Sequence, residues 1–226
     1  MKTQHEIKLY YNNLAVEYDK DRFDNSYGRY IDRQEKIIIS RLLKHTKKSE
    51  TLDLACGTGR FLEYAQHAAD ISPEMLNEAR KKYPDNIFYE CNALDTQFED
   101  NRFSTILSFH FVMHLDLEAT KQFISETHRI LKPEGKLIFD FPSKSRRQII
   151  DYKSKGWHAS NSLTIEEIKK ICSGKFNLNC SCGILFFPIH RFPKRIRHFL
   201  LNIDSWICRS YFRKYASYII VELEKI

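Results

Sequence analysis

Two glycines separated by one residue, Gly57 and Gly59, are the first feature of this chain that could do chemistry. They follow an apolar run over residues 51–55, and this pattern predicts a buried strand that ends in a tight turn. Such a turn lets the backbone approach a ligand closely and directs free N–H groups at it. Asp53 precedes the glycines and Asp70 follows them. Together these residues predict a site for a nucleotide-like cofactor.

The spacing of these residues excludes two common nucleotide motifs. The dinucleotide fingerprint requires a third glycine three residues after the second, and that position holds Leu62. Its acidic residue is expected about 20 residues further on, whereas Asp70 comes much earlier. The phosphate-binding loop requires Gly-Lys-Ser/Thr, which does not follow here. Neither motif therefore fits.

The stretch Asp53-Leu54-Ala55-Cys56-Gly57-Thr58-Gly59 resembles the D-x-G-x-G-x-G signature of the class I S-adenosyl-L-methionine (SAM) methyltransferases. Ala55 replaces the first glycine of that signature. The resemblance extends over residues 50–142 and more loosely to the ends of the chain. It implies SAM as cofactor and S-adenosyl-L-homocysteine as product. It also implies that four residues of the stretch bind the cofactor: Asp53, Ala55, Gly57 and Gly59.

Later segments carry further cofactor-binding positions of this family. Residues 70–76 resemble its second motif, in which the acid, here Asp70, binds both ribose hydroxyls. Asp70 could instead cap the helix that follows. Asn92 stands where the family usually has a carboxylate for the adenine amino group, and its amide oxygen can still accept a hydrogen bond. The other cofactor-binding residues that the resemblance implies are Tyr18, Arg22, Ile71, Met75, Ala93, Leu94 and Ser108.

Two histidines are candidates for catalysis. Methyl transfer from a sulfonium is an in-line displacement, so positioning and desolvation can supply most of the catalysis. A hydroxyl acceptor would gain from a base with a pKa near 7, and histidine is the usual choice. His114 and His110 follow the predicted fourth strand, although each could be an ordinary structural histidine. No metal site is predicted. The candidate substrate contacts are Tyr11, Trp157, His158 and His190.

The elements that must position these residues alternate between strands and helices. The sequence predicts an α/β fold, a doubly wound seven-stranded sheet that is mostly parallel with an antiparallel last strand. A helix is expected to begin at Phe61, and residues 21–30 are expected to form a loop. The predicted strands lie at 51–55, 66–70, 87–90, 103–109, 137–141, 176–187 and 218–223.

Two helical additions are expected around this sheet. Residues 1–45 are predicted to form an N-terminal helical lid, although the apolar spacing over 4–22 is also typical of simple packing. Residues 46–226 form the SAM-binding domain, with a basic amphipathic helical insert at 188–217. The insert could pack on its own domain, close over the substrate or meet anionic lipid. Its apolar stripe consists of Ile196, Phe199, Leu200, Ile203, Trp206, Ile207 and Tyr211.

Charge and cysteine content restrict the partners and the compartment. Residues 143–226 hold 16 Lys and Arg against 6 Asp and Glu, whereas residues 1–142 hold 20 against 23. This asymmetry predicts an anionic or phosphorylated small-molecule acceptor rather than nucleic acid. Six cysteines without a CxxC pair, no secretory signal and no membrane-length apolar run predict a cytoplasmic protein. Peripheral membrane contact through residues 191–214 stays open.

These observations predict a SAM-dependent methyltransferase that acts on an oxygen or nitrogen of a small molecule. A sugar, a nucleotide-sugar or a lipid-linked glycan is the candidate acceptor. An RNA methyltransferase is one alternative, because the basic C-terminal third could meet phosphates, although no RNA-binding module is visible. A non-catalytic SAM- or nucleotide-binding regulatory protein is the other, because Asn92 and Ser104 stand where acids are common in the family.

Overall fold

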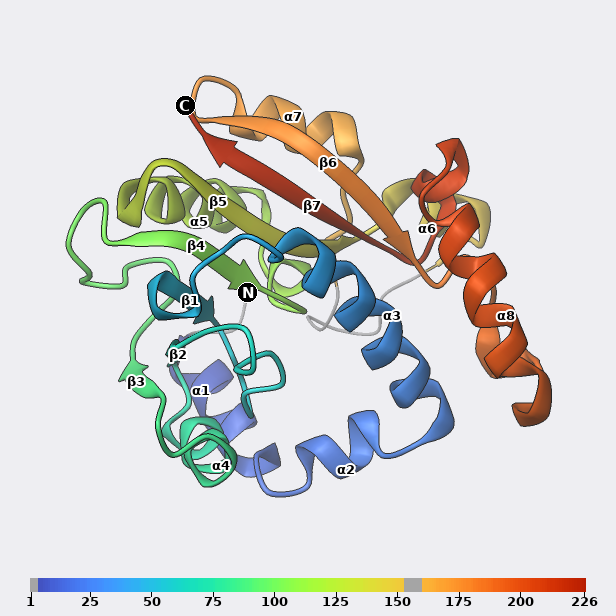
Figure 1. Ribbon diagram of the computed structural model, residues 1–226, viewed down its shortest axis with the longest axis horizontal. Helices are drawn as coiled ribbons and strands as arrows, with labels where there is room; N and C mark the ends of the chain where they lie inside the picture. Colours follow the sequence, from blue (N-terminus) through green and yellow to red (C-terminus); the bar gives the residue numbers. More distant parts are fainter. Residues whose placement is uncertain (1–3, 153–159) are drawn as a thin grey trace.

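The computed structural model describes residues 4–152 and 160–226 of the chain. Its centre is a seven-stranded sheet with the strand order β3-β2-β1-β4-β5-β7-β6 (Figure 1). Strands β1 to β5 are parallel, and β7 runs antiparallel to both of its neighbours. The predicted sheet is therefore confirmed. The strands are β1 (Thr51–Leu54), β2 (His67–Asp70), β3 (Ile87–Glu90), β4 (Phe103–Ser108), β5 (Leu131–Pro142), β6 (Phe176–Ile184) and β7 (Tyr218–Lys225).

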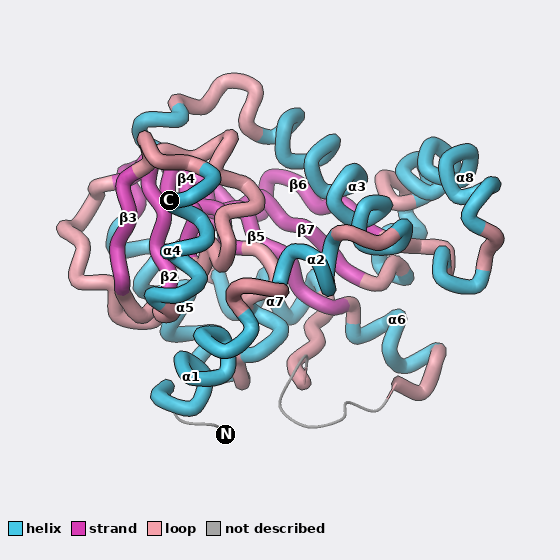
Figure 2. Tube along the Cα trace, turned by 90° about the horizontal axis from the view of Figure 1, so that it is seen from below, coloured by secondary structure: helices cyan, strands magenta, loops and turns pink. Residues whose placement is uncertain are grey.

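Helices cover both faces of this sheet (Figure 2). Side chains of one strand alternate between the faces: Ile106 packs in the apolar cluster that α5 and α7 complete, whereas its neighbour Leu107 packs in the cluster with α3. Val221 and Ile220 of β7 divide in the same way. The helices are α1 (Gln4–Leu14), α2 (Tyr18–Phe23), α3 (Ser26–Leu42), α4 (Pro73–Lys82), α5 (Leu117–Ile130), α6 (Lys144–Ile149), α7 (Ile165–Cys172) and α8 (Lys194–Ile207).

Two helices begin with side chains that favour a helix start. The side chain of Ser72 accepts from the backbone N–H of Met75, and Pro73 occupies the first helical position of α4. Thr164 forms a capping box with Glu167 at the start of α7. The start of α4 lies directly after β2, the strand beside the glycine turn. It therefore fixes the direction in which the chain leaves β2.

The helix expected to begin at Phe61 is absent, and residues 57–64 form successive turns. The N–H of Leu62 donates to the carbonyl of Gly59, and the N–H of Tyr64 donates to that of Phe61. These bonds join residues three apart, a tighter pattern that does not extend into an α-helix. Gly57 and Gly59 have φ values of 53° and 81°, outside the helical region. The turn therefore reaches β2 without a helix.

Three other stretches have boundaries that the sequence pattern did not give. The helix-like spacing over 4–22 belongs to two helices, because α1 ends at Leu14 and α2 begins at Tyr18. The expected loop over 21–30 contains the start of α3, where the side chain of Asn25 accepts from the N–H groups of the next turn. Strand β5 includes the expected turn over 132–136, with a register irregularity there. These errors fall at element ends and leave the sheet order unchanged.

The insert at 188–217 lies between β6 and β7 and is helical, as expected. It contains α8 and the short 3₁₀ turns η3 (Ile189–Arg191) and η4 (Tyr211–Tyr215). Helix α8 lies beside α3 in both ribbon views (Figures 1 and 2). Among the described residues, no helix has the length and apolar content needed to cross a bilayer. The remaining 3₁₀ turns are η1 (Lys48–Glu50) and η2 (Val112–His114).

Candidate active site

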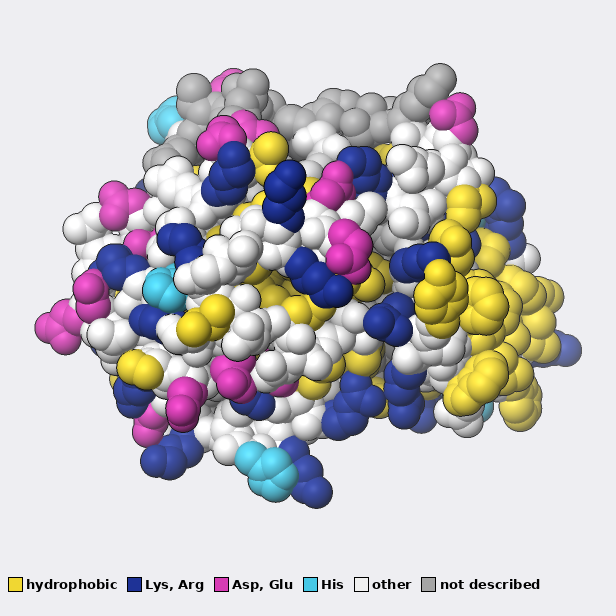
Figure 3. All heavy atoms as spheres, turned by 90° about the horizontal axis from the view of Figure 1, so that it is seen from above, with side chains coloured by type: hydrophobic (Ala, Val, Ile, Leu, Met, Phe, Trp, Pro, Cys, Tyr) yellow, Lys and Arg dark blue, Asp and Glu magenta, His cyan; other side chains and the backbone are white. Residues whose placement is uncertain are grey.

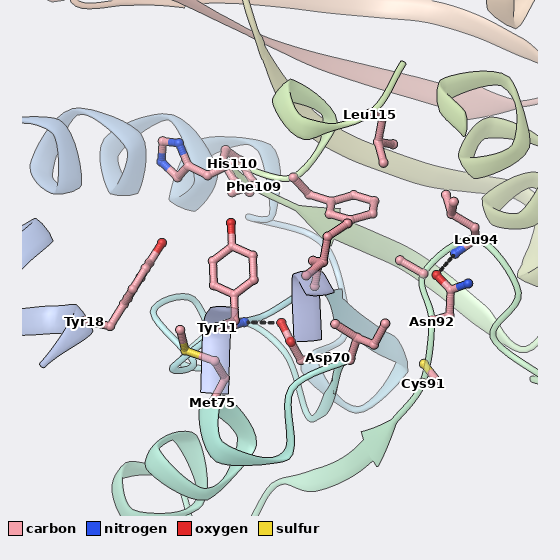
Figure 4. Close-up of a pocket in the computed structure, with 16 residues that line it drawn as sticks. Tyr11, Tyr18, Asp70, Met75, Cys91, Asn92, Leu94, Phe109, His110 and Leu115 are labelled. Atoms are coloured by element: carbon pink, nitrogen blue, oxygen red, sulfur yellow. Dashed lines mark hydrogen bonds between the residues drawn. The ribbon is translucent and has the colours of Figure 1, made fainter. Parts of the chain in front are cut away.

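The carboxyl ends of β1, β2, β3 and β4 border a cavity of about 140 Å³ (Figure 4). In open α/β sheets, ligands bind at this edge. The glycine turn contributes Ala55 and Gly57, and α1 closes the cavity with Ile7 and Tyr11. The cavity brings together nine of the residues expected to bind the cofactor: Tyr18, Ala55, Gly57, Asp70, Ile71, Met75, Asn92, Ala93 and Leu94.

Four expected cofactor residues do not line this cavity. Asp53 lines a smaller adjoining cavity of about 50 Å³, and Arg22 lines a larger one described below. Ser108 is fully buried in β4. Gly59 faces packing rather than open space, because a Cβ there would lie 2.7 Å from Cδ1 of Leu62. The role of Gly59 is therefore to let the turn pack closely against its own neighbouring side chains.

Sequence reasoning missed several residues that line the main cavity. Phe109 and Phe111 flank His110 directly after β4, and Leu115 follows η2. Cys91 extends the wall after β3. Each follows the carboxyl end of a strand, and that position alone was a signal that they lie at the ligand edge. These side chains make much of the wall apolar.

Asp70 lies at the end of β2 and uses both carboxylate oxygens within the protein. Oδ2 accepts from the N–H of Gly57 at 2.8 Å, and Oδ1 accepts from the N–H of Ser72 at 2.9 Å. Burial raises the pKa of Asp70, although these two hydrogen bonds oppose the shift. Asp70 therefore links the glycine turn to the start of α4 while it lines the cavity. A carboxylate has about four lone-pair sites, so it can accept further bonds from a diol.

Asn92 shapes the loop that follows β3. Its Oδ1 accepts from the N–H of Leu94 at 3.1 Å (Figure 4). An amide oxygen has two lone pairs, so this bond leaves one for a ligand amino group. The arrangement is compatible with the expected adenine contact, and that contact stays a prediction.

A second cavity of about 450 Å³, here called the aromatic chamber, adjoins the first. The two share Tyr11, Tyr18 and His110 as common wall. His114 and Arg22 also line the chamber. Its aromatic side chains are Tyr11, Tyr18, Phe23, Tyr27, Tyr152 and Tyr218.

Tyr11 and His114 form a pair at the boundary of the chamber. The Tyr11 hydroxyl lies 3.2 Å from Nε2 of His114. Burial raises the pKa of the Tyr11 hydroxyl, so this group keeps its proton and can donate to the imidazole. Of the other substrate candidates, His190 is exposed and its ring contacts Tyr27 at 6.2 Å between centroids. Trp157 and His158 lie outside the described residues.

His110 has a different environment, in which both ring nitrogens face carboxylates. Its Nε2 lies 2.9 Å from Oε1 of Glu35, and its Nδ1 lies 3.6 Å from Oδ2 of Asp140. Arg60 pairs with the other oxygen of Glu35. Burial disfavours the charged imidazole, but the two carboxylates outweigh it and raise the pKa of His110. Because both ring nitrogens of His110 already face carboxylates, neither is available to take an acceptor proton, so the geometry favours His114 for that role.

The pKa of Glu35 is lowered to about 2, because Arg60 and His110 together overcome the cost of burying its charge. Ligand atoms of Glu35, His110 and Asp140 lie within 4.8 Å of one another. Arg60 and His110 lie against these two acids, so basic side chains already oppose them without a metal ion. Neither acid was a candidate in the sequence, because each becomes significant only through the packing of α3 and β5 against the end of β4.

Residues 52–139, which contain the glycine turn and the four strand ends that border the cavity, match the family model described as "Methyltransferase domain". The chain carries a class I SAM-dependent methyltransferase domain. This finding confirms the predicted SAM-dependent methyltransferase class. The nine expected residues lie together at the strand-end edge of this domain.

The matches to curated relatives of the methyltransferase domain extend over only part of each relative's length. The chain is 30% identical over 152 residues to the ubiquinone/menaquinone biosynthesis C-methyltransferase of Campylobacter jejuni, covering 61% of this chain and 64% of that protein. It is 26% identical over 175 residues to the malonyl-[acyl-carrier protein] O-methyltransferase of Hamiltonella defensa, covering 72% and 67%. The chain thus spans less than two thirds of the first relative's length.

A solved structure shares the fold over nearly the whole chain. It is the magnesium protoporphyrin IX methyltransferase of Synechocystis with bound S-adenosylhomocysteine, at a TM-score of 0.66 and 15% identity. The match covers 99% of each chain. It confirms the predicted Rossmann-like methyltransferase fold.

Proposed function

We propose that this protein transfers the methyl group of SAM to an oxygen or nitrogen of a small acceptor held in the aromatic chamber. The observation that carries the proposal is the wall shared by the two cavities, formed by Tyr11, Tyr18 and His110. An acceptor in the chamber would meet a cofactor bound at the strand ends across this wall. Helices α1 and α2 supply both tyrosines, so they act as the lid expected for residues 1–45.

The cofactor supplies an electrophilic methyl group on a sulfonium, and the chain's own residues position the acceptor and manage its proton. The apolar wall excludes water from the reacting atoms. For a hydroxyl acceptor, the acceptor proton passes to the Tyr11 oxygen as the Tyr11 proton moves to Nε2 of His114, 3.2 Å away. The acceptor oxygen, freed of its proton, would then take the methyl group, whose bond to sulfur breaks with the electron pair remaining on sulfur. His110 is held between the carboxylates of Glu35 and Asp140 and positions this wall.

The chamber favours a planar acceptor with an anionic group. Six aromatic side chains line it, and Arg22 supplies a cation that suits a carboxylate or phosphate. The relatives are named for quinone and malonyl-carrier substrates, so they give no support to the expected sugar or glycan acceptor. They also do not favour the RNA-modifying or non-catalytic alternatives. Carbon methylation of a quinol ring is a second candidate, favoured by the aromatic wall and by the name of the Campylobacter relative.

We also propose that the protein works in the cytoplasm with residues 191–214 in contact with a membrane. All six cysteines are free, as expected in a reducing compartment. The segment combines basic residues with exposed aromatic side chains, including Phe199 and Trp206. This combination is typical of peripheral membrane contacts.

The test is a direct assay of S-adenosylhomocysteine formation with a panel of acceptors. The panel contains a planar quinol, a planar aromatic carboxylic acid, a phosphorylated sugar and a short RNA. We expect turnover with a planar acceptor, and a KM at least tenfold higher for the anionic one in Arg22→Gln. Arg80→Gln, a change of a cation on α4 away from the chamber, is the matched control. Binding of S-adenosylhomocysteine without turnover of any acceptor would contradict the proposal.

A further inference from the structure

Helix α8 turns an apolar face to solvent. Phe199 and Trp206 are 73% and 72% exposed, and Ile196 and Ile203 are 41% and 53% exposed. Their spacing of three, four and three residues places them on one face of the helix. The adjoining turn η4 adds Tyr211 and Phe212, at 71% and 54% exposure. Figure 3 shows hydrophobic side chains gathered at the end of the molecule where α8 lies, with Lys and Arg beside them. These six residues are called the α8 surface below.

The opposite face of α8 is fixed to the domain by a buried acid. Oδ2 of Asp204 accepts from the Tyr30 hydroxyl at 2.9 Å, and Oδ1 accepts from the backbone N–H groups of Phe186 and Phe187. Asp204 and Leu201 are almost fully buried. Rotating the helix to bury the apolar face would expose these groups and leave the backbone donors without their acceptor, which is costly. The anchoring of Asp204 therefore holds the apolar face of α8 toward solvent.

The charge around the α8 surface is strongly one-sided. Residues 188–217 contain seven Lys and Arg, and their single acid is the buried Asp204. Four of the cations are exposed: Arg191, Lys194, Arg195 and Arg209. A second copy of this chain on the same surface would bring like charges together, whereas anionic lipid headgroups are complementary to them. Aromatic and aliphatic side chains beside cations are the pattern of segments that insert at a bilayer interface.

We propose that the α8 surface docks on an anionic lipid bilayer and brings the aromatic chamber next to the bilayer. The role given to the chamber rests on the proposed function. Two contacts join the α8 surface to the chamber. The ring of His190 in η3 touches Tyr27 of the chamber wall, and Nη1 of Arg197 in α8 donates to the Ser26 hydroxyl at 2.7 Å. The docked face is thus continuous with the start of α3, which forms one side of the chamber. The acceptor class is therefore an amphiphile that partitions into membranes, with its reacting head in the chamber.

The docking is tested by sedimentation of the whole chain with vesicles, without acceptor or turnover. Vesicles of phosphatidylcholine alone are compared with vesicles that contain one part in three of phosphatidylglycerol. We expect binding to the anionic vesicles only, weakened by added salt. Lys194→Ala with Arg195→Ala is expected to lower partitioning about 25-fold, since each cation near the surface contributes about fivefold. Phe199→Ser with Trp206→Ser is expected to lower it at least about tenfold.

The matched control is Leu117→Ser with Lys81→Ala, which removes an exposed apolar side chain and an exposed cation on other helices. It should bind as the unaltered chain does. Thermal unfolding without vesicles confirms that every variant folds. Equal binding to neutral and anionic vesicles, or none to either, would overturn the proposal. So would a dimer in sedimentation velocity that the Phe199→Ser, Trp206→Ser variant dissociates, because a second copy would then occupy the surface. Failure of turnover with all acceptors leaves this result unaffected and refutes only the proposed function.

Discussion

Nε2 of His110 lies 2.9 Å from Oε1 of Glu35, at the wall that the two cavities share. His110 has a φ of 57°, in the left-handed region that costs a residue with a side chain about 1 kcal/mol or more. Its own N–H donates to Oδ1 of Asp140 at 2.6 Å. The strained backbone thus places a cation between two buried acids. The wall of the active site depends on this charge balance.

We expect His110→Asn to lower the free energy of unfolding by about 3 kcal/mol or more, because it takes the imidazole away from two buried acids, Glu35 and Asp140. Asparagine tolerates the left-handed backbone, so strain is not the cause. Urea unfolding at pH 6 measures the change. Adding Asp140→Asn to the same chain should recover part of the loss, since the amide oxygen can still accept from the N–H of residue 110. A double variant as unstable as the sum of the two single changes would contradict this account.

The same cluster predicts how stability depends on pH. The pKa of His110 is raised in the folded chain, so its contribution is present below about pH 6.5 and is lost as pH rises through the folded value. The pKa of Glu35 is lowered to about 2, so its contribution is present above about pH 4.5 and is lost as pH falls. The stability difference between the unaltered chain and His110→Asn should therefore be largest near pH 5 to 6. Unfolding free energies at pH 4, 6 and 9 check this, and a difference that stays constant would contradict it.

Asp53 is expected to lower the stability of the folded chain at high pH while it contributes to cofactor binding. It is 2% exposed, Oδ2 has no hydrogen-bond partner in the described part of the chain, and burial raises its pKa to about 7. The folded chain holds this proton at pH values where the unfolded chain has lost it. Stability should therefore fall between pH 4 and pH 8, by on the order of 4 kcal/mol from this group.

Asp53→Asn should remove that fall and be the more stable chain at pH 8. If the carboxylate binds the cofactor as the resemblance implies, the same variant should bind S-adenosylhomocysteine about tenfold more weakly. Urea unfolding at both pH values and calorimetry measure the two effects. Parallel pH profiles for both chains would rule out the buried carboxyl as the cause.

The sheet could be predicted because its signals are local. Each strand is a short apolar run, and Ser72 and Thr164 carry the capping chemistry of their helices within four residues. The ligand edge followed from the fold, since parallel strands end at one edge. The turn at residues 57–64 misled the prediction because its apolar residues also suit a helix start.

The charge cluster could not be predicted for a different reason. Glu35 and Asp140 are distant in sequence from His110 and are brought to it only by the packing of α3 and β5 against β4. The outward stripe of α8 is a similar case. Its spacing indicates an amphipathic helix, but only the anchoring of Asp204 decides which face is buried.

Asp70→Ala should weaken binding of S-adenosylhomocysteine about 10- to 100-fold, because a carboxylate bonded to the ribose diol contributes roughly 1.5–3 kcal/mol. The substitution also removes the acceptor for Gly57 and Ser72, so it lowers thermal stability without ligand. Calorimetric titration below the unfolding temperature separates affinity from stability. Asp85→Ala, an exposed acid after α4, is the control and should bind as the unaltered chain does. An unchanged dissociation constant in Asp70→Ala would mean that Asp70 only joins the turn to α4.

The Tyr11–His114 pair separates binding from chemistry. His114→Gln should lower kcat with a hydroxyl acceptor about 100-fold or more, since it removes the proton acceptor. The dissociation constant of S-adenosylhomocysteine should change little, because His114 lines the chamber and not the cofactor cavity. Tyr11→Phe should lower kcat by a similar factor if the Tyr11 hydroxyl carries the proton. If the Tyr11 ring serves only for packing, kcat of this variant should stay within a few-fold of the unaltered chain. Raising the pH should partly restore His114→Gln for an acidic acceptor, because such an acceptor loses its proton to solvent. Equal loss at every pH would show that the histidine positions the acceptor instead of taking its proton.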